Sequence, residues 1–261
     1  MSTAGADKEV ILEGILSIKA AAESRNRCII KVLADEKKVR ERDRKATHFI
    51  SFLKAEGIEY ELCPREKIDG IVSENSGGST HGGFVAFAGE RSYTPFSAFL
   101  EKVAKSGGYA VCLDGVEDPY NFGYSVRSLY AFGAKGVILP ERNWMTAASA
   151  VARSSAGSSE LCEMTLLPDD ETAAELIHSH GIDIVCSALS ASSVSMYDFS
   201  PKKPFILFIG GEKRGISKTF MENADQVVHI PYPNENAKYS LPTASVAAIF
   251  SSSLYGKIKA D

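Results

Sequence analysis

The sequence lacks the features that mark membrane, secreted and disulfide-rich proteins. It has no apolar run near the roughly 20 residues that a membrane-spanning helix needs. Its start, MSTAGADKEV, lacks the basic and then apolar pattern of a signal peptide. Its five cysteines are odd in number and widely spaced, which argues against a disulfide framework and a zinc site. We therefore expect a cytoplasmic protein with no metal, whose cysteines are small buried side chains.

Two common nucleotide-binding signatures are also missing. No strand-like run is followed by the G-x-G-x-x-G of a nicotinamide-binding fold. Gly210 and Gly215 have the spacing of a phosphate loop, but Ile216 stands where that motif requires lysine. The formal net charge of −4 at pH 7 does not indicate a nucleic-acid binder when the chain is taken whole. These absences disfavour a dehydrogenase and a phosphate-loop nucleotide enzyme.

One short stretch departs from that charge balance. KKVRERDRK, residues 37–45, holds six basic residues against two acidic ones. Such a run is either a solvated helix face or an edge that meets phosphate in a salt-sensitive way. The second interpretation predicts RNA contacts by Lys37, Lys38, Arg40, Arg42 and Arg44.

The first hundred residues alternate between helical and strand-like patterns, which indicates a small α/β unit. We expect helices at 10–22, 44–57 and 64–73, and strands at 28–34, 58–63 and 84–88. A connector at 93–106, which becomes a helix, separates this unit (1–92) from the rest (107–261).

The second part of the chain alternates more plainly between apolar runs and helical stretches. The strand-like runs are 109–116, 135–140, 161–167, 182–189, 205–210 and 226–231. Buried runs without polar alternation, spaced by helices, indicate a mostly parallel sheet covered on both faces, so the predicted class is α/β. Ligands of such sheets bind at the carboxyl ends of the strands. Functional residues are therefore expected just after each strand.

The first candidate site is EDPYNFGYSVR, which follows the first of these strands. Asn121 suits the N-cap of a helix. Arg127 would lean back over Gly123, where no side chain fills the space, so its guanidinium would reach the mouth of the sheet. A helix N-terminus there already favours anions. The alternative is a surface arginine that pairs with Asp118 or Glu117.

The second candidate site is GGEKRGIS, which follows the run at 205–210. Its glycines, closed by Gly215, allow the backbone to approach a ligand closely. Glu212 is held between them, which suits a neutral or cationic ligand or an arginine.

The third candidate site lies in HIPYPNENAKYSLPTASVAAIFSSSLYGKI, residues 229–258. A strand ends at Pro231, a polar loop follows, and residues 240–245 lead into a helix rich in alanine and serine. Small side chains allow close helix packing, which suits a subunit interface or a tight core.

Together these segments resemble the SpoU/TrmH family of the SPOUT superfamily, the S-adenosylmethionine-dependent RNA 2′-O-ribose methyltransferases. NFGYSVR (121–127) matches the family's N-x-G-x-x-x-R, and GGEKRG (210–215) matches its G-x-E-x-x-G. The third motif is matched by Ile230-Pro231 and by SVAA at 245–248, and RSSAGSSE (153–160) is similar to a Ser-Ala-Gly stretch between the motifs. The front of the chain is similar to a ribosomal-protein-like RNA-binding domain.

The resemblance implies a fold and an activity. The fold is a mostly parallel sheet with a C-terminal trefoil knot, preceded by a small α/β RNA substrate-binding domain. The activity is methyl transfer from S-adenosylmethionine to a ribose 2′-hydroxyl in rRNA or tRNA. The resemblance also implies a homodimer in which the last helix packs against the partner.

The resemblance further implies roles for individual residues. The catalytic set is Asn121, Arg127, Glu212, Ser240 and Thr243. The cofactor would be held mainly by backbone groups of Ile209, Gly210, Gly211, Glu212, Gly215, Ile230, Pro231, Ser240 and Leu241. In the family the arginine that matches Arg127 is proposed to take the hydroxyl proton. Because a guanidinium is a poor base, the alternative is that it clamps the neighbouring phosphate and stabilises the alkoxide.

The third motif departs from the family pattern. Where the family has Ser-Leu-Asn, this chain has Ser240-Leu-Pro242-Thr243. Either Pro242 or Thr243 stands at the asparagine, depending on the direction of counting, so the amide is absent. Thr243 can keep one hydrogen bond, and Asn234 or Asn236 can supply others. Because of this departure, the alternative to an active methyltransferase is a catalytically inactive RNA-binding protein with the same fold.

Overall fold

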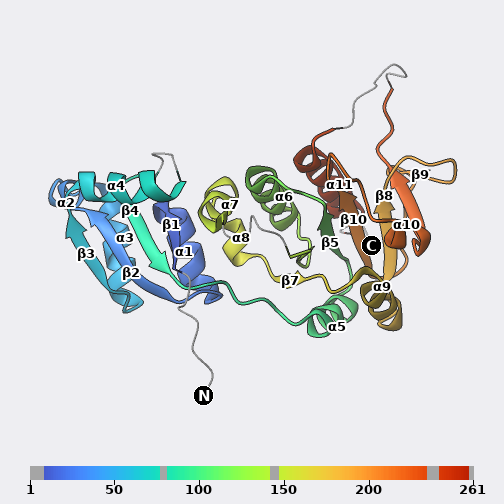
Figure 1. The fold of residues 1–261 in the computed structure, drawn as a ribbon, viewed down its shortest axis with the longest axis horizontal. Helices are drawn as coiled ribbons and strands as arrows, with labels where there is room; N and C mark the ends of the chain where they lie inside the picture. The colour runs from blue at the N-terminus through green and yellow to red at the C-terminus, as the bar shows by residue number, and fades with distance from the viewer. Residues whose placement is uncertain (1–8, 77–80, 142–146, 234–240, 259–261) are drawn as a thin grey trace. The chain divides into compact units, whose positions relative to one another are not determined.

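The computed structural model describes residues 9–76, 81–141, 147–233 and 241–258. The chain forms two compact units (Figure 1). The first comprises residues 1–92 and 146–161, and the second comprises 93–145 and 162–261. This division differs from the boundaries expected from sequence in two places. Segment 146–161 joins the first unit, and the expected connector at 93–106 belongs to the second.

A four-stranded mixed sheet forms the centre of the first unit. Its order is β1 (Val10–Glu13), β4 (Phe84–Ala88), β2 (Ile29–Asp35) and β3 (Tyr60–Cys63). Strand β4 is antiparallel to both neighbours, whereas β2 and β3 are parallel. Three of the strands confirm the runs expected from sequence.

The helix expected at 10–22 is only partly correct. Val10–Glu13 pair with β4 as strand β1, and helix α1 (Gly14–Ser24) begins after them. Gly14 has φ +80°, a conformation that glycine adopts at little cost, so the chain turns there from strand to helix. Pairing with a strand more than seventy residues away is what overrides the local helical spacing.

Helices cover both faces of the first sheet. Helices α1 and α3 (Arg44–Ala55) contribute Ile18, Phe49 and Leu53 to the core on one face. Helix α4 (Arg65–Ser76) contributes Ile68 and Val72 to the core on the other face. The short helix α2 (Glu36–Arg40) follows β2 directly, capped by the side chain of the last strand residue.

Segment 146–161 packs into the first unit through α7 (Ala148–Ser154) and α8 (Ser158–Leu161). Ala152 is part of the core beside α1. A Cβ atom at Gly157 would lie 2.8 Å from the Leu16 carbonyl oxygen, so only glycine allows this approach. The buried Glu160 carboxylate accepts a hydrogen bond from Arg27 at 2.9 Å. The Ser-Ala-Gly stretch therefore lies in the first unit.

A seven-stranded parallel sheet forms the centre of the second unit. Its order is β7 (Met164–Leu166), β6 (Val137–Leu139), β5 (Tyr109–Asp114), β10 (Phe205–Gly210), β8 (Asp183–Ser187), β11 (Gln226–His229) and β9 (Val194–Ser195). All six neighbouring pairs are parallel. The mostly parallel sheet expected from sequence is confirmed, and only the two-residue edge strand β9 was not expected.

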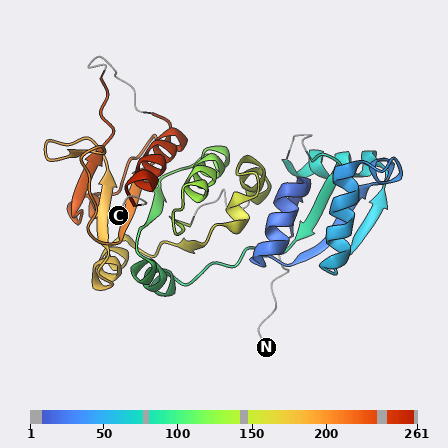
Figure 2. The ribbon, with the colours of Figure 1, turned by 180° about the vertical axis from the view of Figure 1, so that it is seen from behind.

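Helices also cover both faces of the second sheet (Figures 1 and 2). Helices α5 (Phe96–Ser106), α9 (Asp170–Ser179) and α10 (Lys218–Glu222) contribute to the core on one face. On the other face, α6 (Pro119–Ala131) packs against α11 (Thr243–Ile258), and α11 packs against β10. Among the described residues, no helix is long and apolar enough to cross a membrane.

The order of the strands reverses between β5 and β10. From β5 the chain moves outward to β6 and β7, and then returns to the opposite side of β5 for the other four strands. In open parallel sheets such a switch point opens a crevice at the carboxyl ends of the two strands. The first two candidate sites follow these two strands.

The cysteines differ in part from expectation. All five are free, and Cys63, Cys112, Cys162 and Cys186 are buried as expected. Cys28 is exposed, at the turn before β2, which corrects the expectation of a buried side chain.

Candidate functional site

The first motif begins helix α6, but Asn121 is not its N-cap. The N-cap is Asp118, whose Oδ1 accepts a hydrogen bond from the backbone N–H of Asn121 at 2.8 Å. Pro119 takes the first helical position, where a missing N–H costs nothing. Asn121 therefore lies inside the first turn, and its side-chain amide is not needed to cap the helix.

The ends of β5 and β10 meet backbone to backbone. A Cβ atom at Gly211 would lie 2.0 Å from the Gly115 carbonyl oxygen. One at Gly210 would lie 2.5 Å from the carbonyl carbon of Gly215. Gly215 itself has φ +67°, and its N–H donates to the Gly211 carbonyl at 3.0 Å. These glycines are required so that the first and second motifs can pack on each other.

Two polar contacts hold the same two loops together. Asp114, the last residue of β5, accepts a hydrogen bond from the Ser217 backbone N–H at 2.9 Å. Lys213 forms an ion pair with Glu117 at 2.9 Å. Neither contact was predicted from the sequence, although Asp114 ends a buried strand and Glu117 follows it closely, where functional side chains were expected.

The third motif reaches the site through Thr243. Thr243 begins α11 and is buried, and its hydroxyl donates to the Gly210 carbonyl at 3.3 Å. This contact places the start of α11 against the end of β10. Ser240, Asn234 and Asn236 lie outside the described residues.

A cavity of about 110 Å³ gathers residues of all three motifs. It is lined by Gly115, Val116, Glu117, Asp118, Asn121, Glu212, Lys213 and Thr243. Three members of the predicted catalytic set, Asn121, Glu212 and Thr243, therefore share one cavity. Pockets for drug-sized ligands and cofactors span about 300–1,000 Å³, so this cavity suits a ribose or another small group and not a whole cofactor.

Arg127 does not line this cavity. It is exposed on α6, on the helix face that also carries the exposed rings of Tyr120 and Tyr124. Within the described part of the chain, its guanidinium makes no hydrogen bond or ion pair. Asp118 instead caps the helix and Glu117 binds Lys213, so the expected alternative of a structural pair with either acid does not occur.

The segments expected to hold the cofactor meet at the same edge of the sheet. Ile209 is buried in β10, with Gly210 at the strand end. Ile230 and Pro231 directly follow β11, two strands from β10 in the sheet. Leu241, half-buried, stands two residues before Thr243 and its contact with β10. The predicted cofactor residues therefore lie where a parallel sheet binds its ligands.

The basic stretch is exposed on the first unit, over α2 and the start of α3. Arg40 pairs with Glu36 at 2.7 Å, and Lys38 donates to the Gly82 carbonyl at 2.8 Å. Lys37 lies 4.0 Å from Glu41. Arg42 and Arg44 are exposed, and neither has a side-chain partner among the described residues. These two arginines are the ones most available to an anionic ligand.

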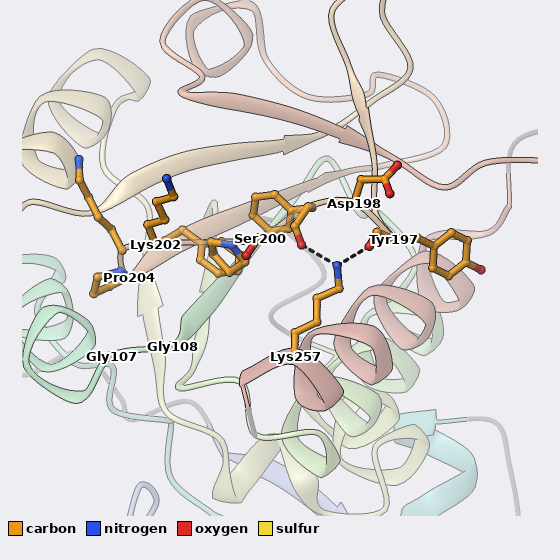
Figure 3. Close-up of a pocket in the computed structure, with 12 residues that line it drawn as sticks. Gly107, Gly108, Tyr197, Asp198, Ser200, Lys202, Pro204 and Lys257 are labelled. Atoms are coloured by element: carbon orange, nitrogen blue, oxygen red, sulfur yellow. Dashed lines mark hydrogen bonds between the residues drawn. The ribbon is translucent and has the colours of Figure 1, made fainter. Parts of the chain in front are cut away.

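A larger cavity of about 500 Å³ lies elsewhere on the second unit (Figure 3). This cavity lies where β5 and β10 begin, and its lining includes Gly108 and Phe205. No predicted site residue lines it. Lys257 points into the turn beside it and donates to the carbonyls of Met196, Tyr197 and Phe199. Because its three N–H groups are all used, this lysine holds α11 to the turn. The volume of a cavity therefore does not by itself identify the functional site of this protein.

Strong pKa shifts occur away from the cavity. Burial raises the pKa of the Cys186 thiol to about 12, with a further contribution from the Asp114 charge. Hydrogen bonds from Lys31 and Lys67 lower the pKa of Glu61 to about 2. None of these four lysine, cysteine and glutamate side chains lines the cavity. In the described ranges, no group of three or more His, Cys, Asp and Glu side chains is placed to hold a metal ion.

The chain matches known families over both of its parts. Residues 108–251 match the SpoU rRNA Methylase family, and residues 11–94 match the family described as RNA 2′-O ribose methyltransferase substrate binding. A 23S rRNA (guanosine-2′-O-)-methyltransferase RlmB of Yersinia pestis is 28% identical over 244 residues, 92% of this chain and 95% of that protein. A putative TrmH family tRNA/rRNA methyltransferase, YacO of Bacillus subtilis, is 27% identical over 205 residues, 78% of this chain and 79% of that protein.

A solved structure has a similar fold. The SpoU methyltransferase AviRb from Streptomyces viridochromogenes, in complex with AdoMet, gives a TM-score of 0.76 at 20% identity. The match covers 96% of this chain and 91% of AviRb. This likeness concerns the fold alone.

The fold and the cavity define an α/β protein with a candidate ligand site at the carboxyl ends of its parallel strands. With the family match over more than half of its length, the chain belongs to the SpoU rRNA methylase family. It is an RNA 2′-O-ribose methyltransferase.

Proposed function

We propose that this RNA 2′-O-ribose methyltransferase acts on ribosomal or transfer RNA, and that the 110 Å³ cavity receives the target ribose. The observation that carries the proposal is the meeting of Asn121, Glu212 and Thr243, one from each motif, around this cavity. The relatives support the substrate class, since RlmB is named for 23S rRNA and YacO for tRNA or rRNA. Action on such RNA also favours a cytoplasmic location.

The cofactor fits the edge where the three motifs converge. Thr243 donates to the Gly210 carbonyl, and the glycines bring the loops after β5 and β10 together backbone to backbone. We assign the cofactor to backbone groups of Ile209–Gly215, Ile230, Pro231 and Leu241, together with Ser240. When bound, S-adenosylmethionine supplies an activated methyl group. The protein must therefore mainly align the hydroxyl in line with the sulfur–methyl bond.

The lining residues suit that alignment. The Asn121 amide offers both a donor and an acceptor to a ribose, and the Glu212 carboxylate accepts hydrogen bonds from hydroxyl groups. Both line a small cavity, where a bound ribose would displace water and strengthen each polar contact. Thr243 has its donor occupied by Gly210, so it contributes position and, at most, an acceptor.

Arg127 acts on the charged groups of the substrate. A guanidinium generally loses its proton only above about pH 12, so a phosphate clamp that also stabilises the forming alkoxide is the better assignment. Arg127 is exposed and has no partner among the described residues, so it is available to RNA.

We propose that two copies of this chain associate through α6 and α11. Tyr120, Tyr124 and Tyr130 on α6 and Tyr255 on α11 are each at least 40% exposed, and the two helices pack side by side. Exposed tyrosines with rings available for contact are typical of interfaces. Arg127 shares this face, so a partner would approach it. Sedimentation equilibrium would test this, because a monomer at micromolar concentration contradicts it.

The domain assignment and the knot are also proposals. The first unit, residues 1–92 with 146–161, would bind RNA, and the second unit, residues 93–145 and 162–261, would carry the methyltransferase site and a C-terminal trefoil knot. The family matches at 11–94 and 108–251 support this order. The basic residues at 37–45 would contact phosphates, because all of them except the half-buried Lys38 are exposed and RNA helices are recognised mainly by shape and phosphate contacts.

Methyl transfer itself tests the proposed function. The protein is incubated with methyl-labelled S-adenosylmethionine and either ribosomal RNA or transfer RNA from cells that lack the enzyme, and the RNA is digested to nucleosides. We expect label in a 2′-O-methyl nucleoside from one of the two pools. Intact binding of RNA and cofactor without label in either pool would contradict the proposal and favour a catalytically inactive RNA-binding protein.

A further inference from the structure

The cavity for the target ribose has an unfavourable charge for RNA. Its described lining includes the carboxylates of Glu117, Asp118 and Glu212, and one cation, Lys213. A ribose within an RNA strand carries a phosphate on the carbon next to its 2′-hydroxyl, so a negative charge enters with it. Three carboxylates at the entrance oppose that charge unless the lysine compensates.

The Lys213–Glu117 ion pair is exposed, so Lys213 can exchange Glu117 for another anionic partner. The two charged groups lie 2.9 Å apart, but the lysine side chain is 79% exposed and the glutamate 43% exposed. Ion pairs between exposed side chains are weak, because water and salt screen them. The loop does not depend on this pair alone, since Asp114 also holds it through the Ser217 backbone N–H. Lys213 can therefore leave Glu117 while the motif loops stay together.

We propose that Lys213 is a substrate-positioning residue that leaves Glu117 to bind the phosphate beside the target ribose. Glu117 keeps the lysine at the mouth of the cavity before RNA arrives, and it competes with the phosphate for the same ammonium group. The inference rests on the proposed function of the cavity as the ribose site. The contrasting interpretation is that the pair is a static link between the first and second motifs.

Two substitutions separate these interpretations because they break the same pair from opposite sides. Lys213→Ala removes the phosphate ligand, whereas Glu117→Gln removes the negative charge that competes for the lysine and keeps the size of the side chain. RNA affinity is measured by fluorescence anisotropy with a labelled substrate RNA at several salt concentrations. Lys213→Ala should weaken binding severalfold and reduce the salt slope by about 0.7–0.9, the loss of one phosphate contact. Glu117→Gln should tighten binding.

The expected result in catalysis is a change in KM for RNA. Lys213→Ala should raise KM more than it lowers kcat, and Glu117→Gln should lower KM. If both variants weaken binding, or both leave affinity and slope unchanged, the pair is a static link and the inference is wrong. Thermal unfolding of both variants, which should match the parent, separates these results from misfolding.

A matched control pair lies on α5 of the same unit. Glu101 and Lys105 are 3.6 Å apart and similarly exposed, but they do not line the cavity. Lys105→Ala and Glu101→Gln should leave both RNA affinity and KM unchanged. Failure of the parent protein to methylate any RNA would contradict the proposed function, whereas methylation with parallel effects of Lys213→Ala and Glu117→Gln would contradict only this inference.

Discussion

The hydroxyl of Thr243 donates a hydrogen bond to the carbonyl of Gly210, 3.3 Å away, and so joins the start of α11 to the end of β10. Thr243 stands where the family pattern is altered, yet it is buried and lines the cavity with Asn121 and Glu212. The altered third motif therefore still reaches the site. The side chain that it presents at the cavity is a hydroxyl already engaged with the backbone.

Replacing Thr243 tests this contact. Thr243→Val keeps the shape but leaves the Gly210 carbonyl without its donor, which should lower the free energy of unfolding by about 1–3 kcal/mol. Urea denaturation followed by circular dichroism measures this. Ser252→Ala, at an exposed position of the same helix, should change it little. An unchanged midpoint for Thr243→Val would mean that the contact does not stabilise the site.

Arg127 is expected to matter for rate and not for folding. Arg127→Ala should lower kcat by about 10²–10³-fold, because one positioned group that stabilises developing charge is removed. It should leave the melting temperature unchanged, since the side chain has no partner among the described residues. Arg127→Lys keeps the charge but not the planar fork and should retain part of the activity. Methyl transfer by Arg127→Ala at the parent rate would contradict both proposed roles.

The contact between Gly211 and Gly115 should tolerate no side chain. Gly211→Ala would place a Cβ atom 2.0 Å from a carbonyl oxygen, so the two motif loops must separate. We expect a loss of about 3 kcal/mol or more in stability, together with weaker binding of S-adenosylmethionine in calorimetry. In α11, nothing lies within 4 Å of a Cβ atom at Gly256. Gly256→Ala should therefore be neutral or stabilise by up to about 1 kcal/mol.

The salt dependence of RNA binding tests the basic stretch. Arg42→Ala with Arg44→Ala should reduce the slope of log affinity against log salt by about 1.4–1.8, two phosphate contacts at roughly 0.7–0.9 each. Lys54→Ala, exposed at the other end of α3, serves as the control and should not change the slope. A slope unchanged by the double substitution would place the RNA elsewhere on the protein.

Thiol reactivity should report the burial of the cysteines. Because burial raises the pKa of Cys186 to about 12, this thiol stays protonated, and therefore unreactive, well above neutral pH. In native protein at pH 8, a disulfide reagent should modify Cys28, the exposed cysteine, and react with the other four only after denaturation. Cys28→Ser should abolish the fast reaction. Rapid modification of Cys112 or Cys186 in the native state would show that the second sheet opens locally.

The local elements could be predicted from the sequence, and so could three residues that meet in one cavity. The apolar run at 205–210 coincides with β10, and helix α3 ends just before Gly57, as predicted. Such signals depend on neighbours a few residues apart, so a single sequence contains them. The motif residues Asn121 and Glu212 were predicted from the resemblance to the family, and both line the cavity; the N-cap role expected of Asn121 belongs to Asp118.

The tertiary structure decided what depends on distant partners. Val10–Glu13 became a strand because they pair with β4, and segment 146–161 joined the first unit because Gly157 and Glu160 fit against α1 and Arg27. The exposure of Arg127 outside the cavity and the Lys213–Glu117 pair depend on where whole helices and loops meet. A local sequence pattern does not predict these contacts, because they are stabilised by residues that are far apart in the chain.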